Sequence, residues 1–140
     1  MAASAPSAFY LDASAIVKIV VRERETEALV DYLGDADLVS SEVAEIEVPR
    51  AAYLRTAEAE SIQQAELVLR RFHLVALDDE LRHEATRAGP PDLRTLDAVH
   101  LVSCLRLGPR VGGIIVYDRR LSAAARARGL HVVAPPARRR

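Results

Sequence analysis

Short apolar runs alternate with longer amphipathic stretches along this chain, and turn-forming residues separate them. A short uninterrupted apolar run is typical of a strand buried on both faces, whereas apolar residues three and four positions apart indicate a helix. The pattern predicts strands at residues 9–12, 38–40, 74–77, 113–117 and 131–134, and helices at residues 14–21, 26–33, 41–57, 61–72, 79–88, 95–107 and 119–128.

Strands that alternate with helices predict a parallel sheet covered by helices on both faces. We therefore expect an α/β fold with a central, mainly parallel sheet of about four to five short strands. The 140 residues contain no internal repeat and no linker rich in proline or glycine, so one domain is expected. In such sheets the functional site lies beyond the carboxyl ends of the strands.

Two aspartates come directly after predicted strands. Asp12 follows the run at 9–11, and Asp118 follows the run at 113–117. Both are therefore expected at the carboxyl edge of the sheet. Aspartate is also a favoured N-cap, where its carboxylate accepts a backbone N–H, so capping is an equally good interpretation of each one alone.

A glutamate interrupts the apolar stripe of the helix predicted at 41–57. Glu47 falls within the arc of apolar residues, whereas Glu42 and Glu45 fall outside it and are expected in solvent. The arc consists of Val43, Ala44, Val48, Ala51 and Leu54. A carboxylate on a buried stripe costs several kcal/mol unless it is paired or metal-bound, and Arg50 or Arg55 would be its structural partner.

A further acid, Asp97, lines up with Leu101 and Cys104 on the helix predicted at 95–107. Its structural interpretation is an acid that stabilises the first turn of the helix, with Thr95 as the cap. His100, three residues after Asp97, would either approach a substrate or be a packed, hydrogen-bonded residue of the core, and its direction away from this line favours packing.

Four carboxylates, from Asp12, Glu47, Asp97 and Asp118, are thus expected to converge. They repel one another, so a cation must lie among them, and ligands that are all oxygen select Mg²⁺ or Mn²⁺. Such an ion lowers the pKa of a bound water and supports phosphodiester hydrolysis. The hydroxyl of Ser14 would cap the first helix, orient Asp12 or bind a metal-bound water, and capping is the favoured single role.

Composition removes several classes of function. A single cysteine, Cys104, excludes an internal disulfide and a zinc site built from several cysteines, and it fits a reducing cytoplasm. No apolar run is long enough to span a membrane. Residues 1–7 lack the charged start of a secretion signal and are expected to form a flexible lead. The glycine patterns of nucleotide-binding loops are absent.

The net charge of −1 does not indicate nucleic-acid binding, but arginines gather at particular places. Arg94, Arg119 and Arg120 flank the acids and would hold phosphates or pair with nearby acids. Residues 135–140 form a basic C-terminal tail, and its last three residues, Arg138 to Arg140, are expected to be disordered. It would add weak, salt-sensitive RNA affinity or only solubility.

A phosphate-accepting α/β domain also places an aspartate after its first strand. Here Asp12 is followed by Ala13 and Ser14, with no second acid two residues on. The single lysine, Lys18, lies in the next helix and not after a late strand. The sequence therefore disfavours this class.

Four segments together resemble the PIN-domain ribonucleases, and among them the VapC toxins of bacterial VapBC toxin–antitoxin systems. They are FYLDASAIVKIVV at 9–21, SSEVAEIEVPRA at 40–51, LRTLDAVHLVSCLRLG at 93–108 and IIVYDRRLSAAARARGL at 114–130. These segments span most of the chain in the order and spacing of the family.

The resemblance implies a single PIN domain over residues 1–140, a three-layer α/β/α sandwich. It implies that Asp12, Glu47, Asp97 and Asp118 bind Mg²⁺ or Mn²⁺ and that Ser14 supports them. The implied activity is endoribonuclease cleavage of tRNA, rRNA or mRNA by a metal-activated water, leaving a 5′-phosphate and a 3′-hydroxyl. A cognate VapB-type antitoxin and a homodimer are the implied partners. The alternatives are a non-catalytic PIN-fold binding module and a PIN nuclease of RNA processing outside a toxin–antitoxin pair.

Two residues depart from the family pattern. Val116 stands where many relatives have Ser or Thr, so a hydroxyl near Asp118 is missing. Pro49 is expected to kink its helix near Glu45 while leaving Glu47 aimed at the site. The helices at 41–57 and 61–72 have apolar residues on two faces, which favours either a dimer or antitoxin surface or packing of the two helices against each other.

Overall fold

The computed structural model describes residues 8–139. Its strands are β1 (Ala8–Leu11), β2 (Asp37–Ser41), β3 (Phe72–Val75), β4 (Ile114–Ile115) and β5 (Val132–Val133). Its α-helices are α1 (Ala13–Val20), α2 (Thr26–Leu33), α3 (Ala44–Thr56), α4 (Glu60–Leu69), α5 (Asp79–Arg87), α6 (Thr95–Leu107) and α7 (Arg119–Ala127), and a 3₁₀ turn follows α6 at Gly108–Arg110. The predicted alternation of strands and helices is confirmed.

The five strands form one parallel sheet in the order β3-β2-β1-β4-β5. The first strand therefore lies at the centre, where Tyr10 pairs with Val39 on one side and Ile114 on the other. Since all strands point the same way, Asp12 at the end of β1 and Asp118 just beyond β4 reach the same edge of the sheet.

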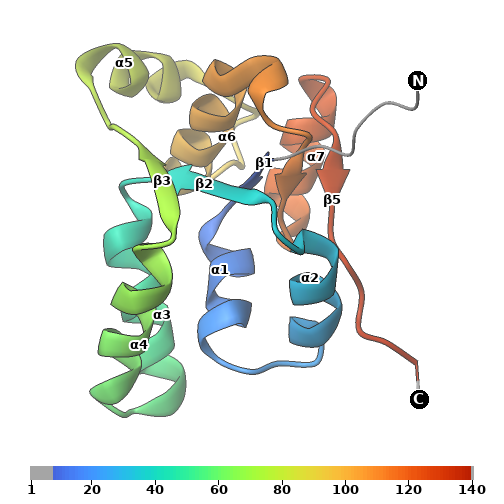
Figure 1. The fold of residues 1–140 in the computed structure, drawn as a ribbon. Coiled ribbons are helices and arrows are strands. Elements are labelled where there is room, and N and C mark those ends of the chain that lie inside the picture. The colour runs from blue at the N-terminus through green and yellow to red at the C-terminus, as the bar shows by residue number, and fades with distance from the viewer. Residues whose placement is uncertain (1–7, 140) are drawn as a thin grey trace.

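The sheet divides the core into two layers because successive strand residues point to opposite faces. Phe9 and Leu11 pack with α1, α2, α3 and α4 on one face, and Tyr10 packs with α6 and α7 on the other. Figure 1 shows the same division, with α5, α6 and α7 above the sheet and the first four helices below it. The expected three-layer α/β/α sandwich is confirmed.

Two predicted helix boundaries are wrong, and both errors concern residues that pair in the sheet. Ser41 is the last residue of β2, opposite Val75, and the helix begins only at Ala44. Phe72 is the first residue of β3, opposite Leu38, and α4 already ends at Leu69. Serine often caps a helix and Phe72 continues an apolar stripe, so the local pattern favours a helix at both places. Pairing with neighbouring strands decides their structure instead.

The segment after β5 contacts the rest of the fold within the described residues, and the expected disorder of 138–140 stays a prediction. Pro135 is buried, and its carbonyl accepts a hydrogen bond of 2.8 Å from the hydroxyl of Tyr117. Arg138 pairs with Glu27 and Asp31 of α2. The lead at 1–7 and Arg140 lie outside the described residues. Within the described part, no helix is long and apolar enough to cross a membrane.

Candidate functional site

A cavity of about 350 Å³ lies at the carboxyl edge of the sheet, between α1, α3 and α6. It is lined by Asp12, Ala13, Ser14, Glu47, Arg94, Thr95, Leu96, Asp97, His100 and Asp118. The structure therefore brings all four predicted acids to one cavity, together with Ser14 and Arg94. Arg119 and Arg120 are exposed at the start of α7 and are not among the lining residues. We call this space the acidic cavity.

The carboxylate of Asp12 is held by its own helix. It is the N-cap of α1 and accepts a 3.1 Å hydrogen bond from the backbone N–H of Ala15. The hydroxyl of Ser14 donates to both Asp12 oxygens, at 2.7 and 2.9 Å, and accepts from the N–H of Tyr117 at 3.2 Å. The favoured capping role for Ser14 is wrong, because Asp12 is the cap and Ser14 orients it.

Burial makes the charge of this carboxylate costly. Asp12 is only 3% exposed, and desolvation raises its pKa to about 6 although His100, Ser14 and the N–H of Ala15 all favour the ionised form. Burial, together with the charges of Asp118 and Glu47, also raises the pKa of Asp97. The acids therefore disfavour one another's ionised forms.

Asp118 combines the two interpretations that the sequence left open. It caps α7 by accepting a 2.9 Å hydrogen bond from the N–H of Leu121, and it also lines the acidic cavity. Asp97 lies in the first turn of α6, as expected. The predicted cap of that helix is wrong: the N-cap is Arg94, whose side chain makes no capping hydrogen bond, and Thr95 is the first helical residue.

Glu47 is paired, but with neither of the arginines that the sequence offered. One of its oxygens lies 2.7 Å from Nε2 of His100, and Nδ1 of the same ring lies 2.7 Å from the hydroxyl of Tyr10. The apolar arc drawn through this helix is wrong at Leu54, which is 63% exposed. The helix continues through Pro49, and Glu47 faces the acidic cavity as expected.

His100 is the cavity residue whose place the sequence interpretation underrated, because core packing was favoured over a place at the site. It is buried and hydrogen-bonded, as predicted, but it also lines the acidic cavity and binds one of its acids. Desolvation lowers the pKa of its ring, but Glu47, Asp12 and Asp97 outweigh that effect and raise it. The signal was its position three residues after Asp97, since residues three apart share a helix face.

Comparison with known proteins assigns the family. A family model described as PIN domain matches residues 9–127. The chain belongs to the PIN-domain family. Ribonuclease VapC46 of Mycobacterium tuberculosis is 41% identical over 131 residues, which cover 92% of this chain and 98% of that protein. Ribonuclease VapC35 of the same organism is 36% identical over 131 residues, covering 90% and 96%. The expected VapC-type resemblance is confirmed.

The donor set of this PIN domain suits a hard divalent cation. The four acids offer only carboxylate oxygens, and a cation among them would offset the cost of ionising Asp12 and Asp97. Within residues 8–139, however, no three acid, histidine or cysteine side chains are close enough together to hold an ion as they stand. The role of these acids as metal ligands stays a prediction.

A groove of about 560 Å³ adjoins the acidic cavity, and the two spaces share Ala13, Ser14, Glu47 and Asp118 as lining residues. The groove also has three cationic side chains, those of Lys18, Arg50 and Arg55. The sequence interpretation assigned no role to Lys18.

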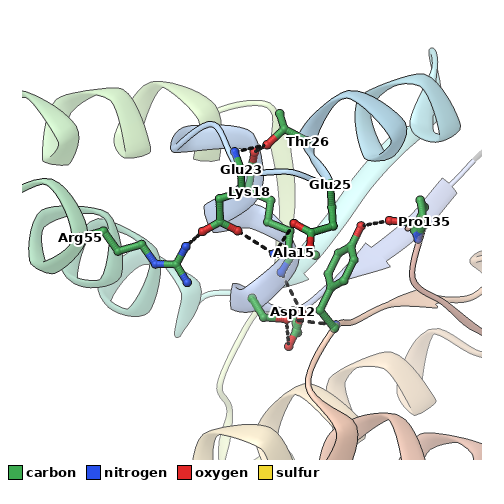
Figure 2. A network of polar contacts seen from close by, with 10 residues as sticks. Asp12, Ala15, Lys18, Glu23, Glu25, Thr26, Arg55 and Pro135 are labelled. Carbon is green, nitrogen blue, oxygen red and sulfur yellow. Dashed lines mark hydrogen bonds and ion pairs between the residues drawn. The ribbon is translucent and has the colours of Figure 1, made fainter. Parts of the chain in front are cut away.

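Lys18 and Arg55 are tied to glutamates of the loop between α1 and α2 (Figure 2). The Nζ atom of Lys18 lies 2.6 Å from Glu23, 3.1 Å from Glu25 and 4.7 Å from the ring centre of Tyr117. Arg55 of α3 reaches the second oxygen of Glu23. We call Lys18, Glu23, Glu25 and Arg55 the Lys18 cluster.

Proposed function

We propose that this PIN domain is a metal-dependent endoribonuclease, the toxin of a type II toxin–antitoxin pair that a cognate VapB-type antitoxin neutralises. The observation that carries the proposal is the gathering of four acids from separate elements in one cavity. Among residues 8–139, no basic side chain is hydrogen-bonded to the buried Asp12. Relatives that cover nearly the whole chain are named ribonucleases, which supports RNA as the substrate.

The residues of the acidic cavity would have different roles in cleavage. Asp12, Glu47, Asp97 and Asp118 would hold Mg²⁺ or Mn²⁺, which supplies an activated water and stabilises charge on the scissile phosphate. Ser14 keeps the Asp12 carboxylate oriented. Arg94, exposed at the rim, is placed to hold a phosphate of the bound strand. Arg119 and Arg120 would contact the strand farther from the reacting phosphate.

The test is cleavage of RNA by the purified protein with Mg²⁺ or Mn²⁺. Asp97→Asn is the variant of choice because Asp97 caps no helix, and Asp92→Asn, an exposed acid on the preceding loop, is its matched control. We expect discrete cuts that need metal, that EDTA abolishes, and that Asp92→Asn retains but Asp97→Asn loses by about 100-fold or more. Cuts that persist in Asp97→Asn would contradict the proposed site.

The chemistry of the product ends gives a second criterion. Attack by water leaves a 5′-phosphate and a 3′-hydroxyl, whereas attack by the ribose 2′-hydroxyl leaves a cyclic phosphate. A cyclic phosphate would overturn the mechanism even if the cuts depend on metal. Absence of cleavage under every metal condition would favour a non-catalytic binding module.

The proposal includes two partners. A VapB-type antitoxin should co-purify with this chain and suppress its cleavage of RNA. The exposed apolar side chains Ile46 and Tyr53 of α3 and Leu67 of α4 are the surface that we assign to the antitoxin or to a homodimer. Light scattering of the free chain at about twice the 15.3 kDa monomer mass would support the dimer.

A further inference from the structure

Glu47 borders two spaces, as Asp118 does, but unlike Asp118 it caps no helix. It lines both the acidic cavity and the adjoining groove, whereas Asp12 and Asp97 line only the acidic cavity. Its side chain is 18% exposed. A flexible glutamate on such a wall has two directions open to it.

The groove offers this carboxylate competing cations. Arg50 lies three residues after Glu47 on α3, and both line the groove. Side chains at this spacing are neighbours on a helix surface, so an acid and an arginine there attract each other. Lys18 and Arg55 line the same groove but are already paired with Glu23, so Arg50 is the main competitor for Glu47. Without a restraint, Glu47 would be drawn toward the groove and away from the other acids.

The restraint is a buried pair on the α6 side of the sheet, formed by His100 and Tyr10. His100 is 1% exposed and Tyr10 is fully buried at the centre of the sheet. An ionised carboxylate only accepts hydrogen bonds, so Nε2 of His100 must donate to Glu47. In the neutral ring, Nδ1 is then the acceptor of the Tyr10 hydroxyl. Tyr10 thereby fixes both the ring orientation and the position of the proton that Glu47 receives.

We propose that His100, held in turn by Tyr10, is a positioning residue that keeps Glu47 on the cavity side against the cations of the groove. The pair reaches Glu47 from β1 and α6, elements remote from α3 in the chain. This inference rests on the proposed function, because the position of Glu47 matters for metal binding only if Glu47 is a metal ligand. Hydrogen-bond partners of metal-binding carboxylates typically contribute 10- to 100-fold to metal affinity.

The test measures Mn²⁺ affinity by calorimetry beside RNA cleavage. His100→Leu removes the donor, His100→Gln returns an N–H at a similar reach, and Tyr10→Phe removes only the hydroxyl. Cys104→Ala, a buried change in the same helix, is the control for lost packing. We expect Mn²⁺ affinity to fall about 10- to 100-fold in His100→Leu and less in Tyr10→Phe, to recover in His100→Gln, and to stay unchanged in Cys104→Ala.

A double variant isolates the role of the groove. Adding Arg50→Gln to His100→Leu removes the nearest competing cation, so part of the lost Mn²⁺ affinity should return. In a Glu47→Gln background, His100→Leu should cause no further loss, because the two residues act as one unit.

The outcomes separate the two proposals. If the unaltered protein neither binds Mn²⁺ nor cleaves RNA, the proposed function fails. If it does both, and His100→Leu and Tyr10→Phe behave like Cys104→Ala, the positioning role is overturned while the nuclease proposal stands. Equal loss of Mn²⁺ affinity in His100→Leu and His100→Gln would also overturn it.

Discussion

Two groups of charged side chains lie next to each other in this molecule, and they are built on opposite principles. The Lys18 cluster matches each glutamate with a cation, and the ion pair with Lys18 lowers the pKa of Glu25. In the acidic cavity, burial and neighbouring acids raise the pKa of Asp12 and Asp97. In the Lys18 cluster the cations prevail, whereas in the acidic cavity burial and mutual repulsion outweigh His100 and Arg94.

The difference supports the proposal that the acids of the cavity serve function, whereas the Lys18 cluster serves the fold. Lys18, Glu23 and Arg55 link α1, the loop after it and α3, so their pairing stabilises the folded chain. The acids of the cavity cost stability when they are ionised, and such a cost persists in proteins mainly at functional sites. The unbalanced charges of the cavity are therefore a better argument for the proposed site than the number of its acids.

Asp12→Asn should produce the largest change, a more stable chain in the absence of metal. Asparagine keeps the capping oxygen but removes the buried charge. A pKa raised from 3.8 to about 6 corresponds to up to about 3 kcal/mol at pH 7. Urea unfolding in EDTA measures this difference. A less stable Asp12→Asn protein would show that the carboxylate is not strained.

The pH dependence of stability, measured for the unaltered protein and for Asp12→Asn, tests the direction of the pKa shift of Asp12. Between about pH 4 and 6 the folded chain holds a proton on Asp12 that the unfolded chain has lost, so the stability of the unaltered protein should fall as pH rises through this range and then level off. Asp12→Asn should lack this contribution. An unchanged profile in the variant would contradict the raised pKa.

A bound divalent cation should offset the repulsion among the acids of the cavity, and so stabilise the unaltered protein but not Asp12→Asn. Binding to the folded state at about 100 times the dissociation constant stabilises by about 2.7 kcal/mol, which raises the Tm of a chain of this size by roughly 5 to 10 °C. Scanning calorimetry with Mn²⁺, with Mg²⁺ and with EDTA measures the shift. Asp12→Asn should lose most of it, and an equal shift in both proteins would place the ion elsewhere.

Breaking the balanced group should have the opposite consequence. Lys18→Met leaves Glu25 without its partner and Glu23 with Arg55 alone. We expect a loss of about 2 kcal/mol, less than for a fully buried pair because these side chains retain some contact with solvent. Urea unfolding with and without Mn²⁺ should show this loss at an unchanged Mn²⁺ affinity. A stability equal to that of the unaltered chain would show that the Lys18 cluster does not stabilise the fold.

The smallest effect is expected at the C-terminal segment. Arg138 pairs with Glu27 and Asp31, but its side chain is 53% exposed. Exposed pairs contribute about 0.2 to 1 kcal/mol and are screened by salt. Arg138→Ala should therefore lower stability by about 0.5 kcal/mol at low salt and less at high salt. A loss that salt does not reduce would mean that the side chain acts through packing.

The sequence predicted the parts of the site that follow from local rules. Asp12 and Asp118 are placed by the strands before them, and Glu47 by its position on a helix stripe. The bond between Tyr10 and His100 joins residues 90 positions apart, and no local pattern reports such a contact. The Lys18 cluster could not be predicted for a similar reason, because Arg55 contacts Glu23 only once α3 has packed against α1.

Two of the acids are also the N-caps of the helices that follow them, and this double use bears on how the fold can change in evolution. Asp12 and Asp118 each accept a backbone N–H at a helix start. Alanine at either position would remove the cap as well as the charge, whereas asparagine would retain the cap. A lineage that gave up cleavage could therefore preserve its architecture by exchanging these aspartates for asparagines, and such exchanges are the trace we expect in PIN domains retained only as binding scaffolds.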